Sequence, residues 1–193
     1  MKGYLSKLLR EKVSRGFTLI ELLVVIAVLG VLAAIVLLAV NPGEQLARAR
    51  DTNRVSAVTQ IGRSLQSYYT AHNGKYPAPA SYLTTLQTSQ DLKTIPTNPA
   101  GSGTTWGDCT AVTGPHDPLT QQGNQSGWCY VVDDPTDLTE TIVFTGLESQ
   151  LNDSKCATGQ TVWWVFSTQN GRGGFTCTAD ALTAPTLNPT FVE

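Results

Sequence analysis

The stretch that decides the fold lies near the N-terminus and reads GFTLIELLVVIAVLGVLAAIVLLAV, residues Gly16–Val40. From Leu22 to Val40 it contains 19 residues without a charge. As an α-helix, a run of that length spans roughly 29 Å, which matches the hydrocarbon core of a bilayer. A core helix of a soluble protein would still show a polar stripe. The stretch therefore predicts a membrane-spanning helix.

Charged residues are distributed unevenly around this helix. Residues 1–16 contain five bases and one acid, whereas the rest of the chain contains 8 bases and 14 acids. Because cytoplasmic flanks carry an excess of Lys and Arg, we expect the N-terminus inside and the remainder outside. A cleaved secretory signal peptide is the alternative, but the apolar run is long and Ala39-Val40-Asn41 is a weak cleavage site. The overall net charge of -2 argues against nucleic-acid binding through bulk positive charge.

One acid interrupts the apolar stretch. Glu21 lies five residues into it, where an ionised carboxylate is costly unless it has a compensating partner. A wet carboxylate at the headgroup level is the alternative. Together with the basic leader and the long apolar helix, the segment Gly16-Phe17-Thr18-Leu19-Ile20-Glu21 resembles the cleavage signature of type IV prepilins and type II secretion pseudopilins.

This resemblance implies a processing pathway. In that family a membrane aspartyl prepilin peptidase cuts after the residue matching Gly16 and methylates the new N-terminus, here Phe17. The cut creates a cationic α-amine, with which Glu21 of a neighbouring subunit can pair in a low-dielectric bundle of helices. We expect this pair to set the axial register of assembly.

A second helix is predicted directly after the apolar one. Asn41 as N-cap, Pro42 and Glu44 match a helix start, so a local break is expected near Asn41. Gly30 is a second weak point. From Gln45 to His72 the pattern is that of an amphipathic helix with one face for a sheet, on which apolar residues and His72 recur at three- and four-residue steps: Val55, Val58, Ile61, Leu65, Tyr68 and His72.

Polar residues lie between these positions, and Asn73-Gly74 is a stop signal. The polar set, which we expect away from the sheet, is Arg48, Arg50, Asp51, Arg54, Gln60, Arg63 and Gln66.

The remaining chain predicts a short helix, Ala80–Leu92, and then an antiparallel sheet of about four strands. The strand candidates are Trp128–Asp133, Glu140–Gly146, Val162–Ser167 and Phe175–Ala179, with Asn170-Gly171 as a hairpin turn. A long helical spine on such a sheet is an α+β arrangement and the pilin architecture. We divide the chain into a leader (1–16), a transmembrane and filament-core helix (17–40), an amphipathic helix (41–73) and a globular head (74–193).

Four cysteines fall in the head: Cys109, Cys129, Cys156 and Cys177. They lie in the part of the chain that we expect outside the cell, where disulfides persist. None of them forms a Cys-X-X-Cys pair, so zinc binding or redox chemistry is not indicated. Three connectivities are open, of which we favour Cys109–Cys129 with Cys156–Cys177.

An acidic cluster is the one candidate for a metal site. Asp133, Asp134, Asp137 and Glu140 could supply oxygen ligands to calcium, and a solvated turn is the alternative. The resemblance implies calcium in a C-terminal loop of the major pseudopilin, but the corresponding loop here, Gln169–Gly174, carries an arginine and no acid.

Catalysis is not expected. The two histidines are His72, which falls on the apolar helical face and is predicted to be core, and His116, which is predicted to lie in a loop. No nucleophile elbow, phosphate loop or HExxH motif is present.

The expected function is that of a filament subunit in a type IV pilus-like fibre, and a type II secretion pseudopilin is the alternative. A third possibility is a single-pass anchored binding protein that never polymerises. The expected partners are prepilin peptidase, copies of this chain or other pilins, and an inner-membrane assembly platform with its ATPase. Nucleic acid would be a partner only of a DNA-uptake pilus. The expected location is the bacterial cytoplasmic membrane and then an extracytoplasmic or cell-surface filament.

Overall fold

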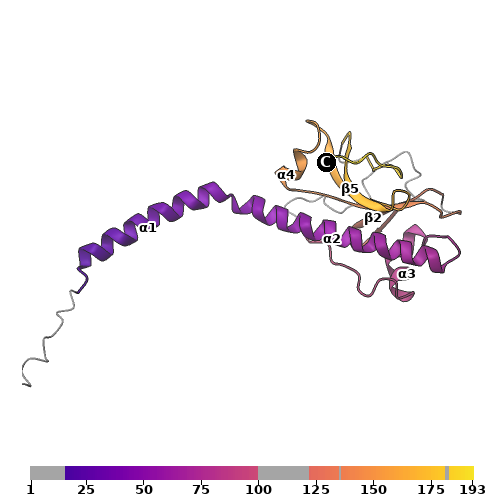
Figure 1. Cartoon of the computed structure of the whole chain (residues 1–193), viewed down its shortest axis with the longest axis horizontal. Coiled ribbons are helices and arrows are strands. Elements are labelled where there is room, and N and C mark those ends of the chain that lie inside the picture. The colour runs from indigo at the N-terminus through magenta and orange to yellow at the C-terminus, as the bar shows by residue number, and fades with distance from the viewer. Residues whose placement is uncertain (1–15, 100–121, 135, 181–182) are drawn as a thin grey trace, which may run out of the picture. The chain divides into compact units, whose positions relative to one another are not determined.

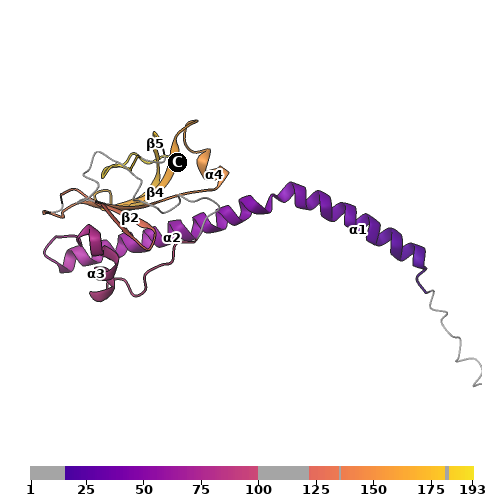
Figure 2. The same cartoon turned by 180° about the vertical axis from the view of Figure 1, so that it is seen from behind.

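The computed structural model describes residues 16–99, 122–134, 136–180 and 183–193, and the chain divides into two compact units, Met1–Pro42 and Gly43–Glu193. Helix α1 belongs to the first unit (Figure 1). The second contains nearly all of helix α2 together with the sheet (Figure 2). His116 and Cys109 lie outside the described residues.

Helix α1, Leu19–Val40, is continuous over 22 residues. It passes through Gly30, so the weak point expected there does not interrupt the helix. It ends at Asn41, whose left-handed backbone (φ 44°) closes the last turn. The expected break at Asn41 is thus confirmed, but Asn41 has the backbone of a C-cap rather than the extended backbone typical of an N-cap.

Helix α2, Pro42–Ala71, packs one face on the sheet (Figures 1 and 2). Val58, Ile61 and Leu65 are fully buried on that face. Gly62 lies among them because the ring of Phe166 occupies its side-chain space, where a Cβ atom would be 2.2 Å from the Phe166 Cγ. The helix stops as predicted, with Asn73 and Gly74 at positive φ.

A short helical segment connects α2 to the sheet. It consists of the 3-10 turn η1, Pro79–Ser81, and helix α3, Tyr82–Thr88, which is shorter than the predicted Ala80–Leu92. Tyr82 is buried and stacks on Tyr130 with ring centroids 4.3 Å apart. Its hydroxyl donates to the carbonyl of Trp128 at 2.8 Å, so the segment is fixed by both apolar and polar contacts.

The sheet has five antiparallel strands in chain order: β1 Gln122–Gln125, β2 Trp128–Val132, β3 Thr141–Gly146, β4 Thr161–Ser167 and β5 Arg172–Thr178. The four predicted strands are present, and β1 adds a fifth at one edge, paired with β2 through Gln125 and Trp128. Gly171 has a positive φ in the tight β4–β5 turn, as the Asn-Gly signal predicts.

Both faces of the sheet are covered. Phe166 and Tyr130 face α2 and α3, whereas Phe144 and Trp163 belong to a second cluster on the opposite face. The C-terminal segment covers this second cluster with Ala184, and its Val192 amide donates to the Phe175 carbonyl at 2.9 Å. This two-sided burial explains why β2 and β3 contain runs of apolar residues rather than strict alternation.

A disulfide joins the β3–β4 connection to β5. Cys156 and Cys177 are bonded, which is one of the two pairings favoured from the sequence. Cys129 is also disulfide-bonded. The closed loop of 21 residues between Cys156 and Cys177 contributes roughly 3 kcal/mol if the effect is mainly on the unfolded chain.

Candidate processing and assembly site

The start of α1 is held by a reciprocal capping box. Thr18 is the N-cap, and its backbone N–H and its hydroxyl each donate to the Glu21 Oε2 atom at 2.9 Å. The Glu21 N–H in turn donates to the Thr18 hydroxyl at 3.2 Å. The Glu21 carboxylate therefore satisfies an otherwise unpaired amide and lies at the positive end of the helix dipole.

Gly16 and Phe17 precede the helix without regular secondary structure. Phe17 is 83% exposed, and no heavy atom lies within 4 Å of the position that a Cβ on Gly16 would take. A peptidase needs such an accessible, non-helical peptide bond. Hydrolysis there would place a new α-amine on Phe17, one residue from the Thr18 amide that already contacts Glu21.

The remainder of α1 is not covered by any other described part of the chain. None of its residues is buried, and among the described residues it is the one helix long and apolar enough to cross a membrane. Exposed fractions reach 86% at Leu38 and 79% at Leu19. Apolar surface of this extent is unfavourable in water, so it requires lipid or other protein to cover it.

A buried ion-pair network in the second unit, missed from the sequence, lies near the start of α2. Arg54 is fully buried, and its Nη1 donates to Asp51 Oδ1 and to Glu148 Oε1, each at 3.0 Å. Its other donors reach Asn98 Oδ1 at 3.2 Å and the Pro99 carbonyl at 2.9 Å. We call Asp51, Arg54 and Glu148 the charged lock.

The charged lock attaches the β3–β4 connection to α2. The Asp51 carboxylate accepts from the backbone amides of Glu148 and Ser149, at 3.0 and 2.9 Å, and from the Asn152 side chain at 2.8 Å. Arg50 adds a second ion pair to Glu148, and this contact raises the pKa of the Arg50 guanidinium. Each of the three charged groups of the lock thus has at least two partners, as buried charges require.

Glu44 makes a second attachment about two turns before Asp51, the first residue of the lock. Its carboxylate accepts from Arg48 at 3.0 Å and from the amides of Gln150 and Leu151, at the start of the short helix α4, Gln150–Asp153. The hydrogen bond from Arg48, followed by that from Gln150, lowers the pKa of Glu44. Arg48, Arg50 and Arg54, the first three arginines after the apolar helix, are therefore each engaged by carboxylates of the second unit.

The polar residues of α2 do not all lie where the sequence pattern places them. Asp51 and Arg54 were expected away from the sheet, but they lie on the buried face. The signal was present in the spacing, because these two residues continue the three- and four-residue steps of the buried stripe, Ala47, Asp51, Arg54, Val58, Ile61 and Leu65.

His72 was predicted to be core and is instead exposed. Its ring stacks on Tyr68 with centroids 3.7 Å apart, and its Nδ1 lies 2.9 Å from the Tyr68 carbonyl oxygen. The buried stripe of α2 ends at Leu65, so His72, seven residues further along, lies outside the buried core and stacks on the preceding turn.

The four candidate calcium ligands are not gathered into a metal site, and no group of three or more His, Cys, Asp or Glu side chains among the described residues could hold a metal ion. Instead, the carboxylates of Asp133 and Asp134 accept hydrogen bonds from hydroxyl groups of the same loop. Thr139 donates to Asp133 Oδ2 at 2.7 Å, and Thr136 donates to Asp134 Oδ1 at 2.6 Å. Glu140 accepts from Gln169 at 3.1 Å. The turn is therefore closed by protein hydrogen bonds.

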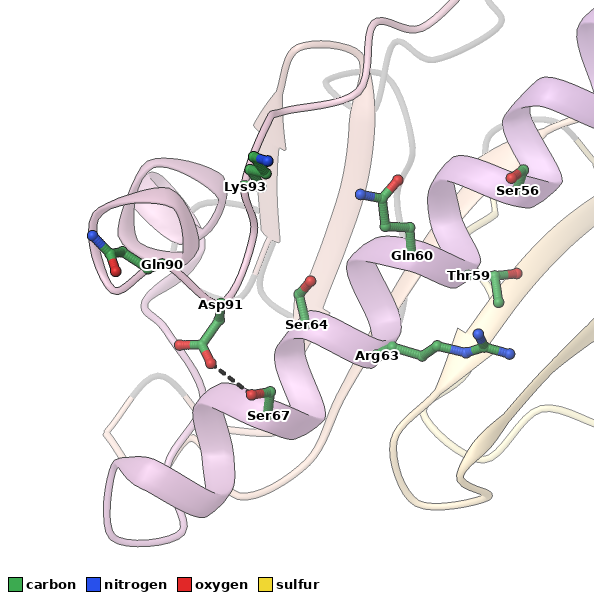
Figure 3. Close-up of a pocket in the computed structure, with 9 residues that line it drawn as sticks. All are labelled: Ser56, Thr59, Gln60, Arg63, Ser64, Ser67, Gln90, Asp91 and Lys93. Carbon is green, nitrogen blue, oxygen red and sulfur yellow. Dashed lines mark hydrogen bonds between the residues drawn. The ribbon is translucent and has the colours of Figure 1, made fainter.

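A polar groove of about 600 Å³ runs between α2 and the segment after α3 (Figure 3). Ser67 donates to Asp91 across it at 2.7 Å (Figure 3). Ser89 donates to the other Asp91 oxygen at 2.7 Å. Hydroxyl and amide groups dominate the lining, together with the exposed cations of Arg63 and Lys93. The groove thus has the character of a hydrated surface, with its single carboxylate already bonded.

Comparison with known families identifies the N-terminal segment. Residues 12–37 match the prokaryotic N-terminal methylation motif, which is the prepilin signal of type IV pilins and pseudopilins. No curated protein and no solved structure matches the chain. The motif covers the capping box and most of α1, and it implies processing by prepilin peptidase and assembly into filaments. The family with this motif is structural rather than enzymatic.

Proposed function

We propose that this protein is the structural subunit of a bacterial type IV pilus-like filament. The observation that carries the proposal is helix α1, which lies largely within the prepilin motif and has none of its 22 residues buried. Lipid covers such a helix before assembly, and the same helices of neighbouring subunits cover it in the filament. The apolar surface of α1 is thus covered first by lipid and then by the helices of neighbouring subunits.

Processing removes residues 1–16. Prepilin peptidase hydrolyses the peptide bond between Gly16 and Phe17, leaving a carboxylate on Gly16 and an amine on Phe17 that is then methylated. The exposed, non-helical geometry at this bond supports the proposal. Cleavage also removes five bases, so the N-terminus loses the charges that hold it on the cytoplasmic side.

Glu21 would guide assembly. In the unassembled chain its carboxylate is bonded to Thr18, and in a bundle of helices it pairs with the Phe17 amine of a neighbouring subunit. Two opposite charges in an apolar bundle are costly when separated and strongly attracted when close. The pair therefore selects the register at which one subunit joins the next.

The regional organisation follows from this cycle. Residues 17–40 form the membrane and filament-core helix, 41–73 continue the spine, and 74–193 form an extracytoplasmic head. The leader remains in the cytoplasm until cleavage. Extraction of α1 from the bilayer requires an inner-membrane assembly platform with its ATPase.

A pilus-like fibre fits the head better than a calcium-dependent major pseudopilin. The β4–β5 turn is closed by the chain itself, because the Asn170 side chain bonds Ser167 at 3.4 Å and Asn188 at 3.3 Å. These contacts tie the turn to the C-terminal segment, and the loop Gln169–Gly174 carries an arginine and no acid.

The test combines N-terminal sequencing with electron microscopy of sheared surface fibres. Wild-type protein should begin at a methylated Phe17 and should form fibres. Glu21→Ala should be inserted and processed normally but should give few or no fibres, and the control Glu193→Ala should assemble like wild type. An intact leader in the wild-type protein would exclude the prepilin function, whereas normal fibres from Glu21→Ala would exclude the role of Glu21.

A further inference from the structure

The two edge strands of the sheet differ in length. β1 spans four residues, whereas β5 spans seven and contains no proline and a single charge. Short edges, prolines and several charges are the usual protections against pairing with a strand of another molecule. β5 lacks all three, so its edge has to be protected in another way.

The C-terminal segment crosses β5 and reaches this edge. We call residues 187–193 the strap. The Thr176 hydroxyl of β5 donates to the Thr190 carbonyl at 3.0 Å. Two residues further along the strap, the Val192 amide donates to the Phe175 carbonyl at 2.9 Å. This bond occupies a carbonyl at which an added strand would otherwise pair.

Phe191 of the strap fits a gap in the surface of β5. A Cβ atom on Gly174 would lie 2.4 Å from the Cδ1 atom of Phe191, so only a glycine leaves room for the ring. The guanidinium of Arg172 lies 4.6 Å from the ring centroid, within cation–π distance. Glycine inside a strand weakens it and often marks a close approach of another group. The composition of β5 is thus adapted to one side chain of the strap.

The strap is attached to β5 more loosely than a sixth strand would be. In the described part of the chain a single β-bridge, between Phe175 and Val192, joins the two. Pro189 has no amide hydrogen and cannot donate to a ladder. At its start the strap is held by the Ser167 hydroxyl, which donates to the Leu187 carbonyl at 3.0 Å. The strap can therefore detach without breaking the ladder between β4 and β5.

We propose that the strap prevents strand addition at β5 and that Phe191 anchors it there. Once Phe191 leaves the gap at Gly174, the edge of β5 can pair antiparallel with β5 of a second copy about a twofold axis. With Phe175 at the centre of such a pairing, Arg172 of each copy lies opposite Thr178 of the other, so like charges do not meet. The inference is independent of the proposed function, because it concerns contacts within the second unit.

Hydrogen exchange at the Val192 amide, measured by NMR on the full-length chain in detergent, tests the anchor. Phe191→Ala empties the gap, and Gly174→Val fills it with a side chain that strands favour. Each variant should speed this exchange by about tenfold or more, while the amides of β2 and β3 exchange as in wild type. Phe191→Tyr keeps the ring and should exchange like wild type.

A matched control and two outcomes decide this arm. Thr186→Ala alters an exposed position just before the strap and should leave the exchange at Val192 unchanged. Unchanged exchange in Phe191→Ala would overturn the anchor. Exchange that rises equally throughout the sheet would also overturn it, because the variant would then have lowered the stability of the whole head.

Sedimentation of the same full-length variants in detergent tests the protection of the edge. Phe191→Ala should form dimers and larger species at protein concentrations at which wild type, Phe191→Tyr and Thr186→Ala do not. Gly62→Ala perturbs the contact between α2 and Phe166 instead, and should sediment like wild type. Equal association of Gly62→Ala and Phe191→Ala would overturn the protective role, since general destabilisation would explain both. A Phe191→Ala chain that sediments like wild type would overturn it as well.

Discussion

The adjacent helices α1 and α2 differ in the kind of side chain that they expose or bury. In α1 the apolar residues are all exposed, whereas in the first half of α2 the charged residues Asp51 and Arg54 are buried. Each arrangement is stable only with a specific partner, which is lipid or other copies of α1 in the first case and the carboxylates and amides of the β3–β4 connection in the second. Burial therefore follows what each helix contacts, not its own composition.

The largest effect is expected from removing the cation at the centre of the charged lock. Arg54→Ala leaves Asp51 and Glu148 buried beside each other without their shared cation, and should lower the free energy of unfolding by about 3–5 kcal/mol. Tryptophan fluorescence during urea unfolding of the full-length chain in detergent measures this. Arg63→Ala, at an exposed position of the same helix, should change it by less than about 0.5 kcal/mol. Equal losses from the two variants would contradict the lock.

A matched pair of glycine substitutions compares the two helices directly. Gly62→Ala places a methyl group where the Phe166 ring lies, and should destabilise the head by about 1–3 kcal/mol. Gly30→Ala in α1 meets no atom within 4 Å, and should leave the unfolding midpoint of the head unchanged. The double variant Gly62→Ala with Phe166→Leu should recover part of the loss. An unchanged midpoint for Gly62→Ala would show that α2 does not pack on β4 at this point.

Sequence patterns predict the regular parts of this structure well, because those parts depend on local signals. The break at Asn41 and the stop at Asn73-Gly74 each lie within a few residues of the element that they delimit. The four strands follow from apolar runs bounded by turn residues. Each of these signals can be read without knowing what lies across the core.

The charged lock could not be predicted in the same way, because its partners are far apart in the chain. Arg54 and Glu148 are 94 residues apart, and nothing local to either indicates the other. The helical spacing alone would place Asp51 and Arg54 on the buried stripe, but charged residues there are normally assigned to solvent. His72 shows the converse error, since a position that continues the stripe lies beyond the sheet that the stripe faces.

Acid should weaken the attachment at Glu44. The pKa of Glu44 is lowered by its hydrogen bonds from Arg48 and Gln150, so its contribution to stability is present above the ordinary pKa of glutamate and is lost as the pH falls through the lowered value. Glu44→Gln should reduce stability at neutral pH, and its difference from wild type should shrink in acid. Urea unfolding at a series of pH values measures this. Glu193→Gln should follow the wild-type profile throughout, and a pH-independent difference for Glu44→Gln would contradict the assignment.

The smallest expected effect concerns Asp153, whose ionised carboxylate is disfavoured by burial and repelled by the neighbouring acids of the attachment. Burial, and then the carboxylates of Asp51 and Glu44, raise the pKa of Asp153. The folded protein therefore binds this proton more tightly than the unfolded chain, and ionisation of Asp153 opposes folding as the pH rises. Asp153→Asn should stabilise the head at neutral pH by less than about 1 kcal/mol, because solvent screens a partly exposed carboxylate. The gain should disappear below the ordinary pKa of aspartate, and a gain that instead grew in acid would show that Asp153 is held as an anion by a cation rather than repelled by its acidic neighbours.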